Sequence, residues 1–236
     1  MGTLFLSHRG ESDDAPENTL EAFQLAMERD SDGIELDLRL TADKQVICFH
    51  DETLERIAQV PLAVADHPLA ELLKYHDIPL FAEALALLGE NKHLQIEMKG
   101  APAILPFARQ ILDEFPGRNR FAISSFEKET IRQAADHFPD LPRVLLTDLR
   151  REFGRFPAPA EVVKLLAPLQ CGISFKADFA ADREFVQELH RAGLRVVCWG
   201  VSSDELGLAM AAAGVDALTC NHAVALRQKY LLSHLL

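Results

Sequence analysis

The sequence predicts an α/β fold, a closed (β/α)₈ TIM barrel in which eight parallel strands alternate with helices. Two patterns point to it: short apolar, β-rich runs recur along the chain, and segments with helical periodicity separate most of them. The length of 236 residues is typical of a compact barrel of this class. The composition, 48% apolar and 25% charged, is that of an ordinary globular protein.

Nine apolar runs are expected to form strands. They are Leu4–Ser7, Gly33–Leu40, Val46–His50, Leu94–Lys99, Phe121–Ser124, Val144–Thr147, Gly172–Phe175, Arg195–Trp199 and Ala217–Thr219. Helical periodicity is clearest in Glu17–Arg29 and Ser203–Ala213, where apolar side chains three and four residues apart share one face. Most strands are therefore followed by a helix, as a parallel barrel requires.

One gap between strands is too short for a parallel connection. Only five residues separate Gly33–Leu40 from Val46–His50, whereas a parallel crossover needs about a dozen or more. These two runs should therefore form a short antiparallel hairpin excursion at the C-terminal rim, which leaves eight strands for the barrel. The alternative is an open doubly wound sheet. It would usually carry a glycine-rich phosphate loop after its first strand, and the sequence after Leu4–Ser7 is not one.

The whole chain, residues 1–236, is expected to form one domain. The long gap after Asp51 is the main irregular region. We interpret residues 51–78 as a short substrate-side loop or small cap, followed by a helix over Leu80–Leu88. The proline-rich piece at residues 156–160 is expected to lead into a helix rather than to separate two domains.

Charge and composition exclude several classes of function. The 24 basic and 36 acidic residues give a net charge of −12, which argues against a general nucleic-acid binder or a polybasic membrane anchor. No apolar run approaches the roughly 18 residues of an integral membrane segment, and the first residues lack the basic start of a signal peptide. The four scattered cysteines are expected to be buried free thiols, which fits a reducing, cytoplasmic compartment.

Carboxylates stand on the inward faces of two predicted strands. Glu35, Asp37 and Arg39 alternate with apolar residues, and Glu97 and Lys99 do the same further along the chain. If the strands are neighbours, the three carboxylates converge near the C-terminal rim. Three oxygen ligands without a His or Cys trio suit one hard divalent cation, Mg²⁺ or Ca²⁺, with Mn²⁺ as a further candidate. The alternative is a buried ion-pair network with Arg9, Arg39 and Lys99.

Two histidines bracket this carboxylate cluster. His8 and His50 each end a predicted strand, and an imidazole can gain or lose a proton near neutral pH. A lone histidine there is usually structural, but the pair suits general acid–base catalysis. Glu17 either supplies charge to a helix start, with Asn18 or Thr19 as the cap, or holds Arg9 or a histidine at the rim.

Trp199 is the only tryptophan in the sequence, and it ends a predicted strand. Its ring is interpreted either as a core side chain or as a wall of the substrate pocket.

In combination, these motifs resemble the glycerophosphodiester phosphodiesterase family. The resemblance is carried by His8-Arg9-Gly10, Pro16-Glu17-Asn18-Thr19-Leu20, Ile34-Glu35-Leu36-Asp37, His50-Asp51 with Thr53-Leu54-Glu55-Arg56, and Ile96-Glu97-Met98-Lys99. It continues through Ile123-Ser124-Ser125-Phe126 and Trp199, and so spans essentially the whole chain. Two segments depart from the family pattern. Ile57–Pro61 replaces a Thr-Gly-rich stretch, and Thr219–Ala223 replaces a Thr-Asp-x-Pro pattern.

The resemblance implies a (β/α)₈ barrel that hydrolyses glycerophosphodiesters, small-molecule substrates, to glycerol 3-phosphate and an alcohol with a divalent metal ion. Carried over by motif, His8 and His50 would be the catalytic pair, and Glu35, Asp37 and Glu97 would hold the metal. The remaining site residues would bind substrate and phosphate (Arg9, Lys99 and Trp199) or support the site (Glu17 and Asp51).

Two other functions stay open at this point. One is a lysophospholipase D-like activity on lipid-tailed substrates, for which an apolar rim would be expected from Phe49, Leu54, Ile57 and Leu62. The other is a non-catalytic phosphodiester-binding barrel, which would have no need of paired acid–base groups.

Overall fold

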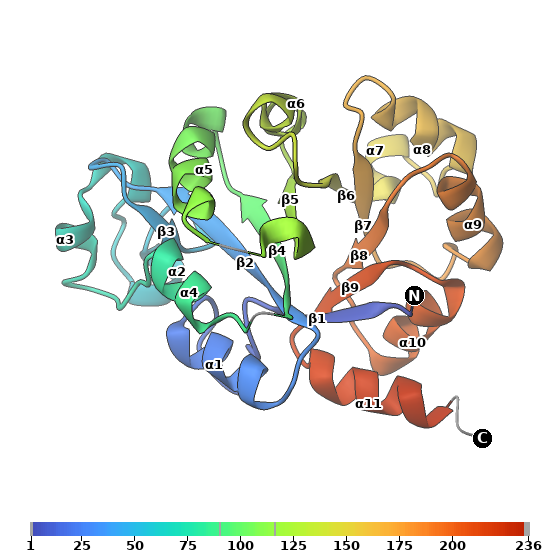
Figure 1. Ribbon diagram of the computed structural model, residues 1–236, viewed down its shortest axis with the longest axis horizontal. Coiled ribbons are helices and arrows are strands. Elements are labelled where there is room, and N and C mark those ends of the chain that lie inside the picture. Colours follow the sequence, from blue (N-terminus) through green and yellow to red (C-terminus); the bar gives the residue numbers. More distant parts are fainter. Residues whose placement is uncertain (1, 90, 116, 234–236) are drawn as a thin grey trace.

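The computed structural model is a closed barrel of eight parallel strands with a ninth strand outside it (Figure 1). It describes residues 2–89, 91–115 and 117–233, so residues 1, 90, 116 and 234–236 of the predicted domain lie outside the described residues. The strands are β1 Leu4–His8, β2 Gly33–Leu40, β3 Val46–Cys48, β4 His93–Met98, β5 Phe121–Ser125, β6 Arg143–Thr147, β7 Gly172–Lys176, β8 Val196–Trp199 and β9 Ala217–Cys220.

The first and last strands of the barrel are hydrogen-bonded neighbours. Strand β1 pairs in parallel with both β2 and β9, so the sheet closes on itself, and the open-sheet alternative is wrong. Strand β3 pairs antiparallel with β2, with Leu38 opposite Cys48 and Leu40 opposite Val46. The predicted barrel and hairpin excursion are confirmed, although β3 ends two residues before His50.

Helices follow the strands and cover the outside of the barrel. They are α1 Leu20–Glu28, α2 Glu55–Ala58, α3 Leu69–Leu72, α4 Phe81–Leu87, α5 Leu105–Asp113, α6 Lys128–His137, α7 Leu149–Phe153, α8 Pro159–Leu166, α9 Arg183–Arg191, α10 Asp204–Ala213 and α11 Ala223–Ser233, with 3₁₀ turns η1 Val64–Asp66, η2 Pro102–Ile104 and η3 Arg118–Arg120. Helix α8 begins in the proline-rich piece, as expected. Helix α1 begins only at Leu20, because the Thr19 hydroxyl caps it by accepting from the Ala22 N–H.

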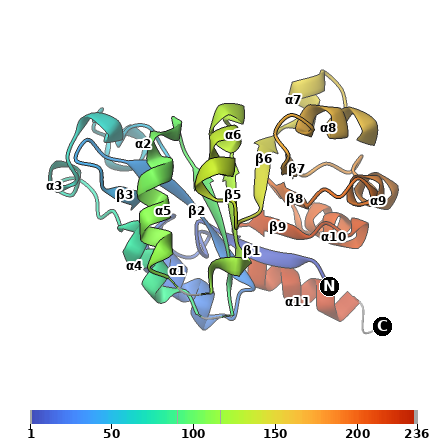
Figure 2. The ribbon, with the colours of Figure 1, turned by 45° about the horizontal axis from the view of Figure 1, so that its top comes forward.

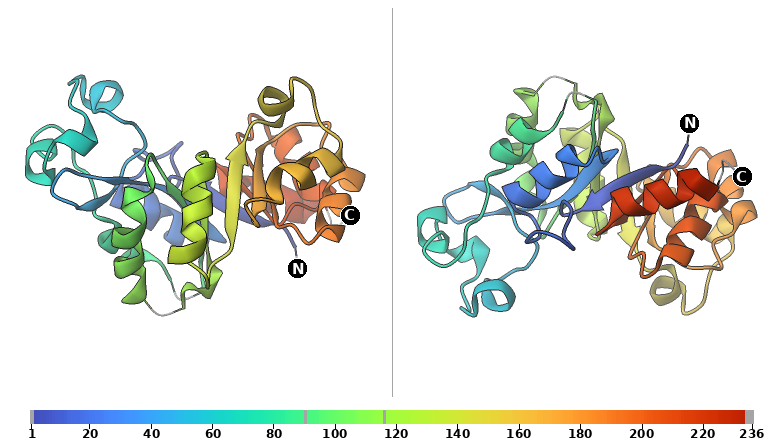
Figure 3. Two further views of the ribbon diagram at one scale, coloured as in Figure 1. Left: turned by 90° about the horizontal axis from the view of Figure 1, so that it is seen from above. Right: turned by 90° about the horizontal axis from the view of Figure 1, so that it is seen from below.

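The two faces of each strand meet different surroundings. On β2, Ile34, Leu36 and Leu38 point outward and pack in one apolar cluster with residues of α1, α4 and α5. Inside the barrel, a smaller cluster near the amino ends of the strands fills the floor; its buried members are Leu6, Val144, Val197 and Ala217. Helix α11 packs against β1 on the outside of the barrel, and α1 and α11 both lie on the side of the molecule seen from below (Figure 3, right). Because these apolar residues fill the end of the barrel near the amino ends of the strands, polar side chains inside the barrel lie toward the carboxyl ends.

Residues 51–78 form a small cap beside β3, which we call the cap segment. The short helices α2 and α3 and the turn η1 surround a separate apolar cluster, whose buried members are Ile47, Phe49, Leu54, Val64, Leu72 and Ile78. The cap segment projects from one end of the molecule, far from α8 and α9 (Figure 2). Its expected place on the substrate side stays a prediction.

Two further expectations can be compared with the described residues. Cys48, Cys171, Cys198 and Cys220 are all buried and free, as predicted. Among the described helices, none combines the length and apolar character needed to cross a membrane.

Candidate active site

One cavity of about 410 Å³ opens at the carboxyl ends of the barrel strands. Seven of the ten predicted site residues line it: His8, Arg9, Glu35, His50, Glu97, Lys99 and Trp199. The other three, Glu17, Asp37 and Asp51, make hydrogen bonds or ion pairs with these residues. The structure therefore brings the whole predicted set together, while the role of each residue stays a prediction.

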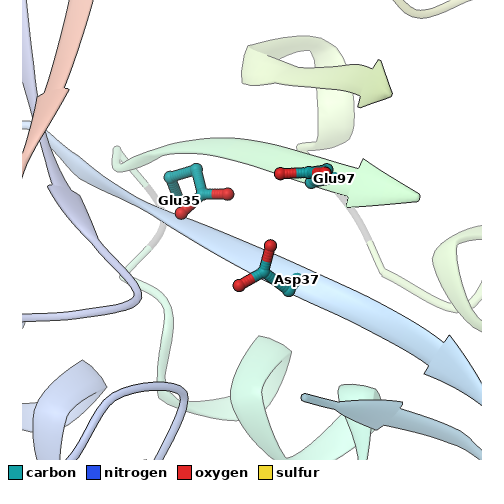
Figure 4. A group of neighbouring side chains, drawn as sticks. All are labelled: Glu35, Asp37 and Glu97. Atoms are coloured by element: carbon teal, nitrogen blue, oxygen red, sulfur yellow. The ribbon is translucent and has the colours of Figure 1, made fainter. Parts of the chain in front are cut away.

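The three carboxylates face one another in the interior of the barrel. Glu35 and Asp37 extend from β2, and Glu97 extends from the neighbouring strand β4 (Figure 4). One oxygen from each lies within 4.8 Å of the others, and each residue is at most 6% exposed. Burial and the charges of its two neighbours raise the pKa of Glu35 well above its usual value. Burial and Asp37 also raise the pKa of Glu97, to about 7.

Two cations offset part of this negative charge. Lys99 Nζ lies 2.7 Å from Glu97 Oε1 and 3.1 Å from Asp37 Oδ1, and Arg9 Nε lies 3.0 Å from Asp37 Oδ2. Although burial alone would raise it, Lys99 and Arg9 hold the pKa of Asp37 below its usual value.

The ion-pair network considered as the alternative to a metal site forms only in part. Arg39 does not join it, because its Nε donates to the backbone oxygen of His50 at 2.8 Å, and it forms no ion pair with a described carboxylate. Three carboxylates therefore share two cations, and their oxygens are the donors that a hard divalent metal ion prefers.

Asn18 holds Asp37 in place, a role that the sequence analysis missed. Its Nδ2 donates to Asp37 Oδ2 at 2.8 Å, and the Asp37 N–H donates to Asn18 Oδ1 at 3.2 Å. Asn18 is 3% exposed and has a φ of 55°, a backbone conformation that asparagine tolerates better than most residues. The helix cap is Thr19 alone. The available signal was the position of Asn18 inside the family motif.

The β1–α1 turn places Arg9 over the carboxylates. Arg9 has a φ of 56°, and its N–H donates to the backbone oxygen of Glu35 at 2.8 Å. Gly10 follows with a φ of 84°, and a Cβ there would lie 2.5 Å from the Ala22 carbonyl carbon. Only glycine therefore lets the turn lie against α1 and direct the guanidinium of Arg9 inward.

A chain of charged groups joins Arg9 to His50. Glu17 Oε1 accepts from Arg9 Nη1 at 2.8 Å and from Arg56 Nη2 at 2.6 Å. Arg56 Nε donates to Asp51 Oδ2 at 2.5 Å, and Asp51 Oδ1 accepts from His50 Nδ1 at 2.5 Å. Glu17 therefore holds basic residues at the rim. Arg56 belongs to a quoted family motif, but it was not predicted as a site residue.

Both histidines are held through Nδ1. His8 Nδ1 lies 2.8 Å from Asn221 Oδ1, and its Nε2 lies 3.9 Å from Glu35 Oε2. Because amide and carboxylate oxygens accept hydrogen bonds, Nδ1 of each ring carries the proton and Nε2 is left for the cavity. Burial and the nearby cations lower the pKa of both His8 and His50. Asn221, which was not predicted, lies in the segment that departs from the family pattern.

Trp199 forms part of the cavity wall. It lies edge-to-face against Phe126 with ring centroids 5.3 Å apart, and its Nε1 donates to the Ser174 backbone oxygen at 3.2 Å. Lys99 Nζ lies 5.7 Å from the centroid of the Phe126 ring. The two rings therefore form an apolar wall beside the charged groups, although contact of Trp199 with substrate stays a prediction.

The apolar rim considered for a lipid-tailed substrate is not present where it was expected. Phe49 and Leu54 are 5% and 0% exposed in the apolar cluster of the cap segment, and Ile57 and Leu62 are partly buried against it. Their side chains stabilise the cap segment, because its short helices have no other core, and they do not line the cavity.

The fold and site define a class of protein: a TIM-barrel hydrolase of phosphate esters, with carboxylates, cations and two histidines around one cavity. Comparison with known proteins identifies the family. The family model described as "Glycerophosphoryl diester phosphodiesterase family" matches residues 8–225, and the chain belongs to this family. It is therefore an enzyme, a phosphoric diester hydrolase with glycerophosphodiester phosphodiesterase activity, and not a non-catalytic barrel.

Individual relatives agree with this assignment. A glycerophosphodiester phosphodiesterase of Caldanaerobacter subterraneus subsp. tengcongensis is 30% identical over 241 residues, covering 92% of this chain and 93% of the relative. A shorter match, 32% identical over 111 residues, covers 47% of this chain and 32% of human lysophospholipase D GDPD1. An Oleispira antarctica phosphodiesterase, solved with the product sn-glycerol-3-phosphate, has the same fold: TM-score 0.82, 24% identity, 96% of each chain covered.

Proposed function

We propose that this enzyme hydrolyses glycerophosphodiesters to glycerol 3-phosphate and an alcohol, using one divalent metal ion held by Glu35, Asp37 and Glu97. The observation that carries the proposal is the buried carboxylate triad with Arg9 and Lys99 against it, inside a cavity that both histidines line. The product bound to the Oleispira antarctica relative supports the choice of products.

The residues present fit a hard divalent cation. When all three are ionised, the buried carboxylates carry more negative charge than Arg9 and Lys99 offset. Burial of uncompensated charge is costly, and the raised pKa values of Glu35 and Glu97 reflect that cost. In addition, Asp37 Oδ1 has Lys99 Nζ 3.1 Å away but accepts no well-aligned hydrogen bond from the described residues. An all-oxygen donor set favours Mg²⁺ or Ca²⁺, with Mn²⁺ as a further candidate. A cation bound there would neutralise charge on the phosphoryl oxygens during attack on phosphorus.

The protein side chains supply the remaining chemistry. A phosphodiester is a stable monoanion, so Arg9 and Lys99 bind it and stabilise the additional charge of the transition state. One histidine accepts the proton of the nucleophile at Nε2, and the other, after protonation, donates to the leaving alkoxide. The nucleophile is water or a neighbouring substrate hydroxyl, and either histidine can serve as the base.

The supporting groups position this machinery. Asp51 orients the His50 ring and stabilises its protonated form, and Glu17 holds Arg9 at the rim. Trp199 and Phe126 offer an apolar surface to the carbon skeleton of the glycerol. The chain would act as a single domain, with the cap segment on the substrate side. Four buried free thiols support a reducing, cytoplasmic location.

The test is turnover of the purified enzyme on a panel of glycerophosphodiesters and one lyso-lipid, with glycerol 3-phosphate measured as the product. Activity should be lost in excess EDTA and return with Mg²⁺, Mn²⁺ or Ca²⁺. Glu35→Gln should abolish metal binding, measured by calorimetry, and activity together. Full activity in EDTA with no metal by elemental analysis would refute the metal site, and turnover of the lyso-lipid alone would favour the lysophospholipase D alternative.

A further inference from the structure

Arg39 is a half-buried arginine beside the active site that the proposed reaction does not use. It follows Asp37 by two residues on the same face of β2, and its Nε donates to the backbone oxygen of His50. No carboxylate among the described residues forms an ion pair with it. Its Nη1 lies 3.9 Å from where a Cβ of Gly100 would be, in the loop after β4. Glu52 is the carboxylate whose charge acts on Arg39 most strongly, but no ion pair with a described residue holds the end of this guanidinium.

Arg39 lines a second cavity of about 360 Å³, between the end of β2, the cap segment and the β4–α5 loop. Its charged lining residues are Arg39, Lys44, Glu52 and Lys99. Lys99 lines this cavity and the active-site cavity alike, so the two meet at the residue that contacts Asp37 and Glu97. Alanines and Gly100 form much of the remaining wall, which leaves space for a small ligand.

The charges of this second cavity favour an anionic group. Two basic residues that form no ion pair with a described carboxylate, Arg39 and Lys44, line it with one acidic residue, Glu52, whereas the ammonium of Lys99 is paired with Asp37 and Glu97. None of its lining residues is aromatic. A trimethylammonium group is usually recognised by aromatic faces and would here meet like charges. A carboxylate, by contrast, matches the planar fork of a guanidinium.

The spacing suits the alcohol half of a bound phosphodiester. Residues two apart on a strand are separated by about 7 Å, so Arg39 lies roughly that far beyond Asp37 along β2. An alcohol with a carboxylate on its second carbon carries that group four bonds from phosphorus, and the long side chain of an arginine at this position can cover the remaining distance. The phosphoryl group beside Asp37 and the guanidinium of Arg39 could therefore be contacted by one substrate.

We propose that the second cavity is the subsite for the leaving alcohol, and that it selects a small zwitterionic headgroup with a carboxylate, as in glycerophosphoserine. Arg39 and Lys44 bind the carboxylate, and Glu52 faces the ammonium group. This inference rests on the proposed function, because it assumes that the phosphodiester is held at the carboxylate triad.

The experiment compares two substrates that differ by one carboxylate, glycerophosphoserine and glycerophosphoethanolamine. The wild-type enzyme should have the higher kcat/KM for the serine ester. Arg39→Gln should lower the serine-to-ethanolamine ratio of kcat/KM about tenfold or more, the size of effect expected from a hydrogen bond between charged groups. Lys44→Ala should lower it less, because Lys44 is exposed. Arg155→Gln, an exposed arginine paired with Glu161, is the matched control and should leave the ratio unchanged.

A binding measurement separates recognition from turnover. Calorimetry with the Mg²⁺-loaded enzyme should show tighter binding of phosphoserine than of phosphoethanolamine, and Arg39→Gln should remove that preference. If Arg39→Gln lowers kcat/KM equally for both esters, Arg39 only positions His50 and the subsite proposal is wrong. Preference for the choline ester would also overturn it. If the wild type hydrolyses neither ester but keeps the phosphoserine preference, the proposed function fails and the subsite stands.

Discussion

Raising the pH should destabilise the metal-free enzyme, and Glu97 should account for a large share of that effect. The pKa of Glu97 is raised from 4.5 to about 7 by burial and by Asp37. Between these two pH values the folded chain therefore holds a proton that the unfolded chain has lost. The native state binds more protons over this interval, so the free energy of unfolding falls as the pH rises.

The size of the effect follows from the shift. One pKa unit corresponds to about 1.4 kcal/mol, so Glu97 should remove about 3 kcal/mol of stability between pH 4.5 and 7. Glu35 acts with the same sign, because its pKa is also raised. The lowered pKa values of His8 and His50 act in the opposite direction near their own titration. A comparison with Glu97→Gln measures the contribution of Glu97 together with the fall in the pKa of Glu35 that follows from the loss of its charge.

The assay is urea denaturation in EDTA at pH 5, 6, 7 and 8, for the wild type and Glu97→Gln. The free energy of unfolding of the wild type should fall relative to the variant by about 3 kcal/mol over this range. Saturating Mg²⁺ should remove the fall, because a bound cation stabilises the ionised carboxylates. If the wild type and the variant show the same pH dependence in EDTA, Glu97 titrates normally and the reasoning from burial is wrong.

The remaining predictions concern the catalytic pair and the support of Asp37. His8→Ala and His50→Ala should each lower kcat about 10²–10⁴-fold with little change in KM, because proton transfer acts in the transition state. Arg9→Ala should both lower kcat and raise KM, because its charge also binds the substrate in the ground state. The measurement is steady-state kinetics on folded variants. If both histidine variants keep a kcat close to that of the wild type, the two histidines are structural and not catalytic. Asn18→Ala should lower the free energy of unfolding, measured by urea denaturation, by about 2 kcal/mol, because the buried carboxylate of Asp37 loses its amide donor. It should also lower the affinity for Mg²⁺. An unchanged metal affinity would show that Asn18 does not position Asp37.

Local patterns in the sequence were enough to predict the barrel and the centre of its site. The five-residue gap before Val46 allowed only a hairpin, and the count of eight parallel strands followed from it. Alternation along two strands placed Glu35, Asp37 and Glu97 on inward faces, and neighbouring strands brought them together. These inferences depend on periodicity and on the lengths of connections, and both can be read directly from a sequence.

The rest of the site depends on contacts between distant segments. Asn221 meets His8 across 213 residues, and Arg56 meets Glu17 across 39, and no local pattern specifies either pair. Asn18 was ambiguous because the same residue type caps helices. Arg39 shares its strand face with Asp37, but it lies so near the end of β2 that its side chain meets the hairpin instead of the carboxylates.

The closure of the barrel between β1 and β9 has a consequence for how the chain matures. The strands β2 and β4, which carry the three carboxylates, pair in parallel and can do so before the end of the chain is made. His8 acquires Asn221 only after β9 has been made. Until then, β1 and β8 each present an unpaired edge, the kind of surface through which incomplete sheets aggregate. Pairing of β9 therefore covers both exposed strand edges and, in the same step, brings Asn221 to the ring of His8.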